Sequence, residues 1–399
     1  MTPARTFLLV VEYDGTNYFG FQRQEGTDRV SDAGPPPKKA RQASTNSSVS
    51  GRAARRAGAP PITIQDQLET ALVRLTGNTL AQLRVRGAGR TDKGVHATGQ
   101  VVAFDYHHQQ SEDDADGKSD DGEAKADAMD SNGAKGRKKE KQAQHQDTSL
   151  FQHALPSEEL WQIRRAINSR LPKDVAVRSC RLIPPPPPGG KPFEARHDVQ
   201  NKRYTYRLRF HRRKMVSIAG DKGGPKMQVI SPICLSGQNT LRSAHDPPNM
   251  WICPWALDEK LIQKVCHLLQ GQHDFSSFVV KCDRRSRNNT IYLKRFSVSF
   301  KDVVEDEDED AGDITGMDNS DDTSTCIPCN ATFVLEAGGF RRQMVRRLIG
   351  FVVDVARGHC SLDSIDETLK GSDEAAQQVH AAPACGLTLS KVEYKILAC

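Results

Sequence analysis

The sequence of 399 residues lacks any long apolar run: no stretch reaches the roughly eighteen residues that a membrane-spanning helix needs. The N-terminus also lacks the pattern of a signal peptide, because the apolar segment FLLVVEY follows only six residues and is typical of a strand. We therefore expect an intracellular protein without a membrane partner, with the cytoplasm, the nucleus and an organelle all compatible with the sequence.

A regular pattern of metal-binding or disulfide-forming residues is also missing. The ten cysteines have no spacing rhythm, and the single CxxC, Cys326 to Cys329, has no second pair at the spacing of a zinc ribbon. The HxE and PCxxC motifs of zinc-dependent base deaminases are both absent. The sequence therefore predicts reduced cysteines, no metal site and no cofactor.

Charge is distributed unevenly along the chain. Three polar segments, 35–60, 111–147 and 302–325, have the composition of disordered insertions, and two of them carry most of the excess acidic charge. The rest of the chain holds 43 basic against 28 acidic residues, although the whole chain has a net charge of only +6. A folded part this basic favours a polyanionic partner such as nucleic acid.

The pattern of apolar residues predicts an α+β fold. Residues 63–77 are typical of a helix that Thr63 caps, and residues 7–13, 83–87 and 100–105 are typical of strands. Further helices are expected at 155–171, 257–271 and 341–358, and further strands at 174–183, 202–210, 290–300 and 386–397. We expect an N-terminal domain over 1–110 and a C-terminal domain over 148–399, whose sheets join.

The segment GAGRTDKGVHATGQVVAFD places Asp92 on a glycine-rich loop between two predicted strands. It does not fit the dinucleotide-binding pattern, because the sixth position is aspartate and a strand follows where that pattern needs a helix. Taken alone, Asp92 is either a turn residue or a catalytic carboxylate.

Six motifs in order resemble those of the TruA-type tRNA pseudouridine synthases, in the branch found in bacteria and organelles. They are VEYDGTNYFGFQRQ, TIQDQLETAL, GRTDKGVHA, PFEARHDVQNKRYTYRL, GQHDFSSF and EAGGFRRQMVRRLIGFVVDVARG. The resemblance covers nearly all of the chain outside the three insertions. It implies two ferredoxin-like or RNP-like domains, a joined and mainly antiparallel sheet, and a central cleft that binds RNA.

The resemblance also assigns roles to individual residues. Asp92 is the expected catalyst, Arg346 the arginine that pairs with it and keeps it ionised, and Tyr204 the ring that stacks on the target base. Arg90 is expected to support the flipped nucleotide or to hold phosphate. The other expected substrate-binding residues are Phe275, Phe278, Phe340, Met344, Val345 and Arg203.

Each role has an alternative that the sequence leaves open. Tyr204 and Tyr206 lie two apart on a strand and can both be core residues; we expect this for Tyr206. Phe275 and Phe278 can equally be core residues, and Arg90 and Arg346 can be solvated charges. Lys202, Arg203, Arg284, Arg285, Arg287, Arg341, Arg342 and Arg347 are candidates for phosphate contacts.

The expected reaction is the isomerisation of uridine to pseudouridine in tRNA, on the 3′ side of the anticodon stem-loop. Asp92 can begin it as a nucleophile at ribose C1′, as a nucleophile at uracil C6, or as a base that removes the 2′ proton. The alternatives are a synthase with other target uridines and a tRNA-binding chaperone of the same fold without catalysis. The expected partner is tRNA, with a homodimer as a further expectation.

Overall fold

The computed structural model describes residues 4–23, 62–107, 160–186, 188–218, 226–230, 246–285, 288–303 and 328–395. The predicted insertions 35–60 and 111–147 lie outside these ranges, and of 302–325 only the first two residues lie inside. Arg287 and Cys326 also lie outside the described residues.

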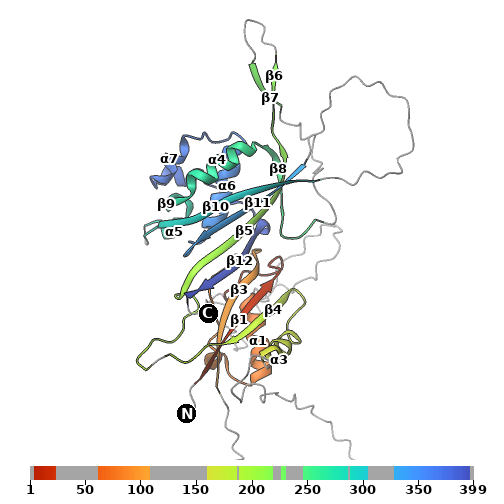
Figure 1. Cartoon of the computed structure of the whole chain (residues 1–399), viewed down its shortest axis with the longest axis vertical. Coiled ribbons are helices and arrows are strands. Elements are labelled where there is room, and N and C mark those ends of the chain that lie inside the picture. Colours follow the sequence, from red (N-terminus) through yellow and green to blue (C-terminus); the bar gives the residue numbers. More distant parts are fainter. Residues whose placement is uncertain are drawn as a thin grey trace, which may run out of the picture.

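Ten strands of the described residues form one sheet (Figure 1). They are β1 (Arg5–Tyr13), β2 (Arg86–Gly87), β3 (His96–Tyr106), β4 (Val175–Leu182), β5 (Val199–Arg212), β8 (Trp251–Leu257), β9 (Gly271–Asp274), β10 (Thr290–Asp302), β11 (Pro328–Ala337) and β12 (Leu387–Tyr394). Their main order is β4-β1-β3-β12-β5-β11-β10-β9, with β2 beside β3 and β8 beside β5. Among these described strands, only β3–β12 and β5–β8 pair in parallel. A separate hairpin pairs β6 (Lys214–Ile218) with β7 (Lys226–Ile230).

Helices cover one side of each end of this sheet. They are α1 (Ile64–Thr76), α2 (Leu80–Leu83), α3 (Leu160–Asn168), α4 (Glu259–Leu269), α5 (Lys281–Arg284), α6 (Met344–Ala356), α7 (Ser364–Leu369) and α8 (Asp373–Gln378), with short 3-10 turns η3 (Ser276–Phe278) and η4 (Ala384–Gly386). In Figure 1, α1 and α3 lie against the β4-β1-β3 end, and α4 and α6 lie against the β5-β11-β10 end. Within the described ranges, no helix is long and apolar enough to cross a membrane.

The predicted elements are largely confirmed, and α1 shows why. Thr63 and Asp66 form a capping box at its start, and Gly77 ends it with a left-handed backbone (φ +71°). The apolar face of α1, which includes Leu68 and Leu72, is fully buried in the core. The mixed α+β class agrees with the sequence pattern, and the mainly antiparallel sheet agrees with what the family resemblance implies.

The strand expected at 83–87 is wrong in most of its length. Leu83 is instead the last residue of the short helix α2, and Arg84 and Val85 are neither helix nor strand. A second capping box starts α2: the Thr79 amide donates to Gln82 Oε1 at 2.8 Å, and the Gln82 amide donates to Thr79 Oγ1 at 3.3 Å. Arg84 then ends the helix with a positive φ of 40°. Only the two residues of β2 remain extended.

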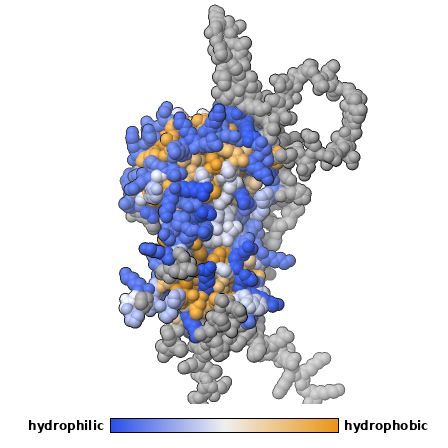
Figure 2. Space-filling model, viewed as in Figure 1, coloured by the Kyte–Doolittle hydropathy of each residue, from blue (hydrophilic) through white to orange (hydrophobic). Residues whose placement is uncertain are grey.

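The alternation along β5 determines which side chains reach the core. Tyr204, Tyr206, Leu208 and Phe210 are buried, whereas Arg207, on the opposite face, is exposed. Seen from the side of Figure 1, hydrophilic residues cover much of the surface around the β5-β11-β10 end of the sheet (Figure 2). One face of this part of the sheet is therefore packed against helices and the other is polar.

Candidate active site

The loop that carries Asp92 is held by hydrogen bonds from two neighbouring segments. The side chain of Gln100, on β3, donates to the carbonyl oxygen of Gly89 at 2.8 Å. The hydroxyl groups of Tyr13, at the end of β1, and Thr91 share a buried hydrogen bond of 2.8 Å. The Phe21 amide also donates to the carbonyl oxygen of Thr91 at 3.1 Å. The backbone before Asp92 is therefore fixed although the loop is rich in glycine.

Glycine in the opening segment allows this close packing. A Cβ atom on Gly20 would lie 2.6 Å from the Thr91 carbonyl oxygen, and Gly20 has a φ of +96°. A Cβ atom on Gly15 would lie 2.0 Å from the carbonyl oxygen of Val95. Larger residues would push the segment away from the loop, so these glycines determine where the Asp92 loop lies.

Arg346, on the first turn of α6, lies beside Asp92. Its Nη1 is 3.7 Å from Asp92 Oδ2, and its Nε donates to the Ala382 carbonyl oxygen at 2.7 Å. The exposed fractions of the two side chains are 17% for Arg346 and 25% for Asp92. The arginine is thus held at a second point and approaches the carboxylate from a fixed direction.

The electrostatic balance at Asp92 combines burial with the positive charge of Arg346, which is expected to keep the carboxylate ionised. Burial raises the pKa of Asp92 above its ordinary value, and the positive charges of Arg346 and Arg342 oppose this shift without overcoming it. The carboxylate therefore lies in a site that favours its protonated form more than water does. A raised pKa makes a carboxylate a stronger base, as proton abstraction requires.

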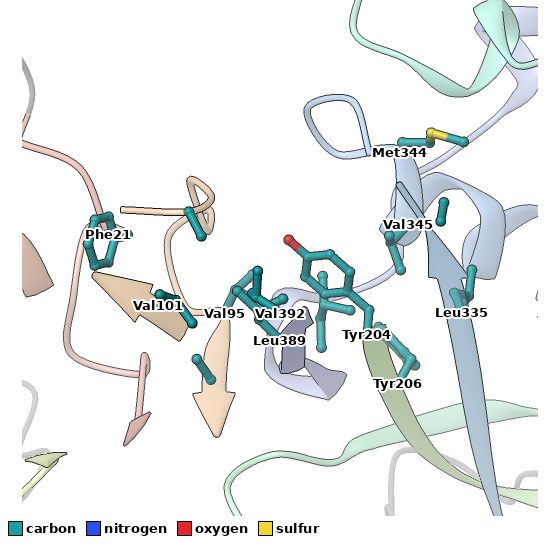
Figure 3. Close-up of a cluster of buried hydrophobic side chains, with 14 of the residues drawn as sticks. Phe21, Val95, Val101, Tyr204, Tyr206, Leu335, Met344, Val345, Leu389 and Val392 are labelled. Carbon is teal, nitrogen blue, oxygen red and sulfur yellow. The ribbon is translucent and has the colours of Figure 1, made fainter. Parts of the chain in front are cut away.

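Tyr204 projects from β5 into the space beside this pair. Figure 3 shows its hydroxyl group pointing away from the core, toward the gap between the Asp92 loop and the start of α6 where Met344 and Val345 lie. The ring is 8% exposed and contacts Phe340 edge to face, with 5.2 Å between ring centroids. Burial, together with the charge of Asp92, raises the pKa of its phenol. No described residue forms a hydrogen bond with that phenol.

A cavity of about 1090 Å³ opens in front of these side chains. Of the residues predicted for the site, it is lined by Asp92, Arg90, Tyr204, Phe340, Met344, Val345 and Arg346. Its walls are strongly basic. The cationic side chains are Arg23, Arg90, Lys93, Arg196, Lys202, Arg341, Arg342 and Arg346, and the only carboxylates among the described lining residues are Asp92 and Asp283. Such a cavity suits a polyanion.

Three of the predicted substrate-binding residues lie elsewhere. Phe275 and Phe278 are fully buried, and Phe278 packs edge to face on Phe351 of α6, so neither ring offers a face to a ligand and the core alternative is favoured. Arg203 points to the opposite face of β5 from Tyr204, where its Nε donates to Glu336 Oε1 at 2.7 Å. Adjacent strand residues alternate in direction, which is why the two cannot share one cavity wall.

Tyr206 is a core residue, as expected. It is fully buried, and its hydroxyl group donates to the Pro383 carbonyl oxygen at 2.8 Å. Gly386 packs so closely on this ring that a Cβ atom there would lie 2.6 Å from it. Tyr206 therefore supports the strand under the site and does not reach the cavity.

The sequence reasoning missed Phe19. This half-buried ring lines the cavity, with Lys93 Nζ 4.2 Å from its centroid. It lies in the opening motif, between Tyr18 and Gly20, so the motif itself was the available signal.

In the described residues, no three or more His, Cys, Asp or Glu side chains lie together in a way that could hold a metal ion.

The chain is similar in sequence to several known proteins that share one name. Residues 265–395 match the family model described as tRNA pseudouridine synthase. The tRNA pseudouridine synthase A of Thermodesulfovibrio yellowstonii is 24% identical over 387 residues, which is 97% of this chain and 98% of that protein. The protein of the same name from Thermotoga neapolitana is 23% identical over 389 residues, covering 97% and 99%. That from Oleidesulfovibrio alaskensis is 26% identical over 333 residues, covering 83% and 84%.

Proposed function

The chain belongs to the TruA family of tRNA pseudouridine synthases, and from this premise we propose that it isomerises uridine to pseudouridine in tRNA with Asp92 as the catalytic residue. The observation that carries the assignment is the convergence of Asp92, Arg346 and Tyr204 on one basic cavity. These three side chains come from the β2–β3 loop, from α6 and from β5, and each brings a group that the reaction needs.

The reaction breaks the bond between uracil N1 and ribose C1′, turns the base, and joins C5 to C1′. The proton on C5 is then lost and N1 gains one, so no group leaves the RNA. Asp92 and Asp283 are the two carboxylates among the described lining residues, and Asp92 is the one that lies beside Arg346, which supports it as the nucleophile or the base. Arg346 keeps the carboxylate in one direction and opposes its protonation.

Tyr204 is proposed to hold the base during its rotation. Its ring forms part of the cavity wall, and its edge-to-face contact with Phe340 limits how it can turn. An aromatic face can stack on any base, so the ring can hold uracil both before and after the glycosidic bond changes. The apolar side chains of Met344 and Val345 beside it would exclude water from the detached base.

The basic wall supports tRNA as the substrate. Arg90 is exposed at the cavity, two residues before Asp92, and no described residue forms an ion pair with it. We propose that it enters the RNA beside the flipped uridine or binds its phosphate. The finer architecture, two RNP-like domains over 1–110 and 148–399 with the cavity as their RNA-binding cleft, is part of the same proposal.

The target uridines are proposed to lie on the 3′ side of the anticodon stem-loop, because GRTDKGVHATGQVVAFD resembles the bacterial and organellar branch of the family. A homodimer also remains a prediction, which sedimentation of the purified protein with and without tRNA would test. Mapping pseudouridine in tRNA from cells with and without this protein would identify the target positions.

The decisive experiment compares the purified protein with its Asp92→Asn variant on unmodified tRNA. Asparagine keeps the size and turn preference of aspartate but removes the charge. We expect the turnover to fall by roughly a thousandfold or more, with tRNA affinity nearly unchanged because phosphate contacts supply most of it. A variant that kept a tenth of the activity would show that Asp92 is not the catalyst. Wild-type protein that bound tRNA without converting uridine would favour the chaperone alternative.

A further inference from the structure

Lys202 lies at the back of the cavity, against the loop that carries Asp92. It precedes Tyr204 by two residues on β5, so both side chains project from the same face of the strand. Its Nζ donates to the Ala88 carbonyl oxygen at 2.7 Å. The same atom lies 3.4 Å from the position that a Cβ atom on Gly89 would occupy. The ammonium group thus has a defined place between the strand of Tyr204 and the loop of Asp92.

The charge of Lys202 has no carboxylate partner among the described residues. An ammonium group has three donors, and the bond to Ala88 uses one of them. Arg23, in the same cavity wall, is by contrast paired with Asp66 and Glu69. Burial, with a smaller effect of the neighbouring Arg196, lowers the pKa of Lys202 to about 8. Holding a charge there without an anion costs stability, which an anionic ligand would offset.

The surroundings of Lys202 favour an anion over a neutral group. The other charged or titratable groups described in this cavity wall are Arg23, Arg90, Asp92, Lys93, Arg196, His197, Tyr204, Cys282, Asp283, Arg341, Arg342 and Arg346. Asp92 and Asp283 are the only carboxylates among these described residues, so the wall is mainly positive. The wall also has room, since a Cβ atom on Gly339 would meet no atom within 4 Å. RNA phosphate is the anion that a tRNA substrate brings to this cavity, and lysine binds phosphate as a point charge.

We propose that Lys202 binds a backbone phosphate next to the target uridine and so positions that nucleotide for Asp92. The inference rests on the proposed function and adds a substrate-positioning residue to it. Two residues along a strand span about 7 Å, so Lys202 can hold a phosphate while Tyr204 holds the base of the same nucleotide. Lys202 supplies no group to the bonds that change, and its effect is on the placement of the substrate.

The first test compares Lys202→Gln and Lys202→Arg with a matched control, Lys294→Gln, which removes an exposed lysine of β10 away from the cavity. For Lys202→Gln we expect KM for tRNA to rise by about tenfold or more. The logarithm of tRNA affinity should also fall less steeply with the logarithm of the salt concentration than in the wild type, with a slope smaller by about 0.7 to 0.9. Lys294→Gln should leave both unchanged. Unchanged KM and salt slope in Lys202→Gln would overturn the proposal.

The pH dependence separates the charge from a merely structural role. Wild-type affinity for tRNA should weaken as the pH rises through about 8, where free Lys202 loses its proton. Lys202→Arg keeps its charge to a much higher pH, so this weakening should disappear while binding at neutral pH is kept. If the weakening persisted in Lys202→Arg, another group would be responsible and the proposal would fail.

The second test uses the wild-type protein and therefore does not depend on the folding of a variant. Single neutral methylphosphonate linkages are placed 5′ or 3′ of the uridine that the wild type converts. One of the two modified tRNAs should raise KM for the wild type by about the same factor as Lys202→Gln does with unmodified tRNA. With the Lys202→Gln protein, the same modified tRNA should raise KM little further. Full affinity of the wild type for both modified substrates would refute the phosphate contact. Failure of the wild type to convert the unmodified tRNA would instead refute the proposed function.

Discussion

Tyr13 and Thr91 share a hydrogen bond of 2.8 Å between their hydroxyl groups, buried beneath the loop that carries Asp92. The first belongs to the end of β1 and the second immediately precedes Asp92, so the bond links the opening strand to the loop that carries Asp92. Together with the Phe21 amide, which donates to the Thr91 carbonyl oxygen, it fixes the residue before the carboxylate on two sides. The position of Asp92 thus depends on side chains that never reach the cavity.

Tyr13→Phe removes one partner of this bond and leaves the Thr91 hydroxyl buried without it. We expect the free energy of unfolding to fall by about 1 to 3 kcal/mol and the turnover number to fall as well, because the loop loses a fixed point. Tyr394→Phe is the matched control, since its hydroxyl donates to the Ala195 carbonyl oxygen in a buried site. Tyr394→Phe should lose about as much stability as Tyr13→Phe and keep the turnover number of the wild type. Equal turnover in both variants would show that the Tyr13 bond is only structural.

Gly20→Ala tests the close packing of the opening segment on the loop. The added Cβ atom would lie 2.6 Å from the Thr91 carbonyl oxygen, at a φ of +96°. We expect chemical denaturation to show a loss of at least about 2 kcal/mol, with a sharp fall in turnover. Gly189→Ala has a similar φ of +76° but no atom within 4 Å, so it should lose only about 1 kcal/mol and stay active. Similar losses of stability in the two variants would mean that the positive φ causes the loss and that the contact with Thr91 does not contribute.

Asp92→Asn should stabilise the folded protein at neutral pH. The pKa of Asp92 is raised on folding, so the native state binds more protons than the unfolded state between the two pKa values. The free energy of unfolding therefore falls as the pH rises through the folded pKa, and asparagine avoids this loss. Thermal unfolding at about pH 7 should give the variant the higher Tm, and the difference should shrink toward about pH 4. A variant less stable at pH 7 would contradict the prediction.

The acidic limb of the pH–rate profile should report the same carboxylate. Turnover falls with decreasing pH as Asp92 gains a proton, at a pH above the ordinary aspartate value of about 3.9. Arg342→Gln removes one of the two charges that oppose protonation, so the limb should move to higher pH. Arg346→Gln should move it in the same direction. The control is Arg347→Gln, whose side chain bonds the Val379 carbonyl oxygen and does not line the cavity. A limb that moved to lower pH in Arg342→Gln would contradict this account.

Local signals in the sequence were sufficient for most of the secondary structure. The capping box at Thr63, the glycine at 77 and the alternation along β5 act over a few residues, so they can be recognised without knowing the fold. The short helix α2 follows the same rule, because the Thr79 and Gln82 capping box that starts it can be recognised in the sequence. The order of the motifs likewise indicated the family and the residues Asp92, Tyr204 and Arg346.

Which side chains meet was decided only by long-range packing. The pairing of β12 with both β3 and β5 leaves the strand of Tyr204 only one strand away from the strand that follows the Asp92 loop, and no short-range signal specifies that order. The same packing sends Arg203 to the far face, buries Phe275 and Phe278, and leaves Lys202 against Ala88. It also raises the pKa of Asp92, because the desolvation of a carboxylate depends on everything packed around it. The sequence thus identifies the residues of the site, whereas their distances, burial and charge states arise from contacts between distant segments.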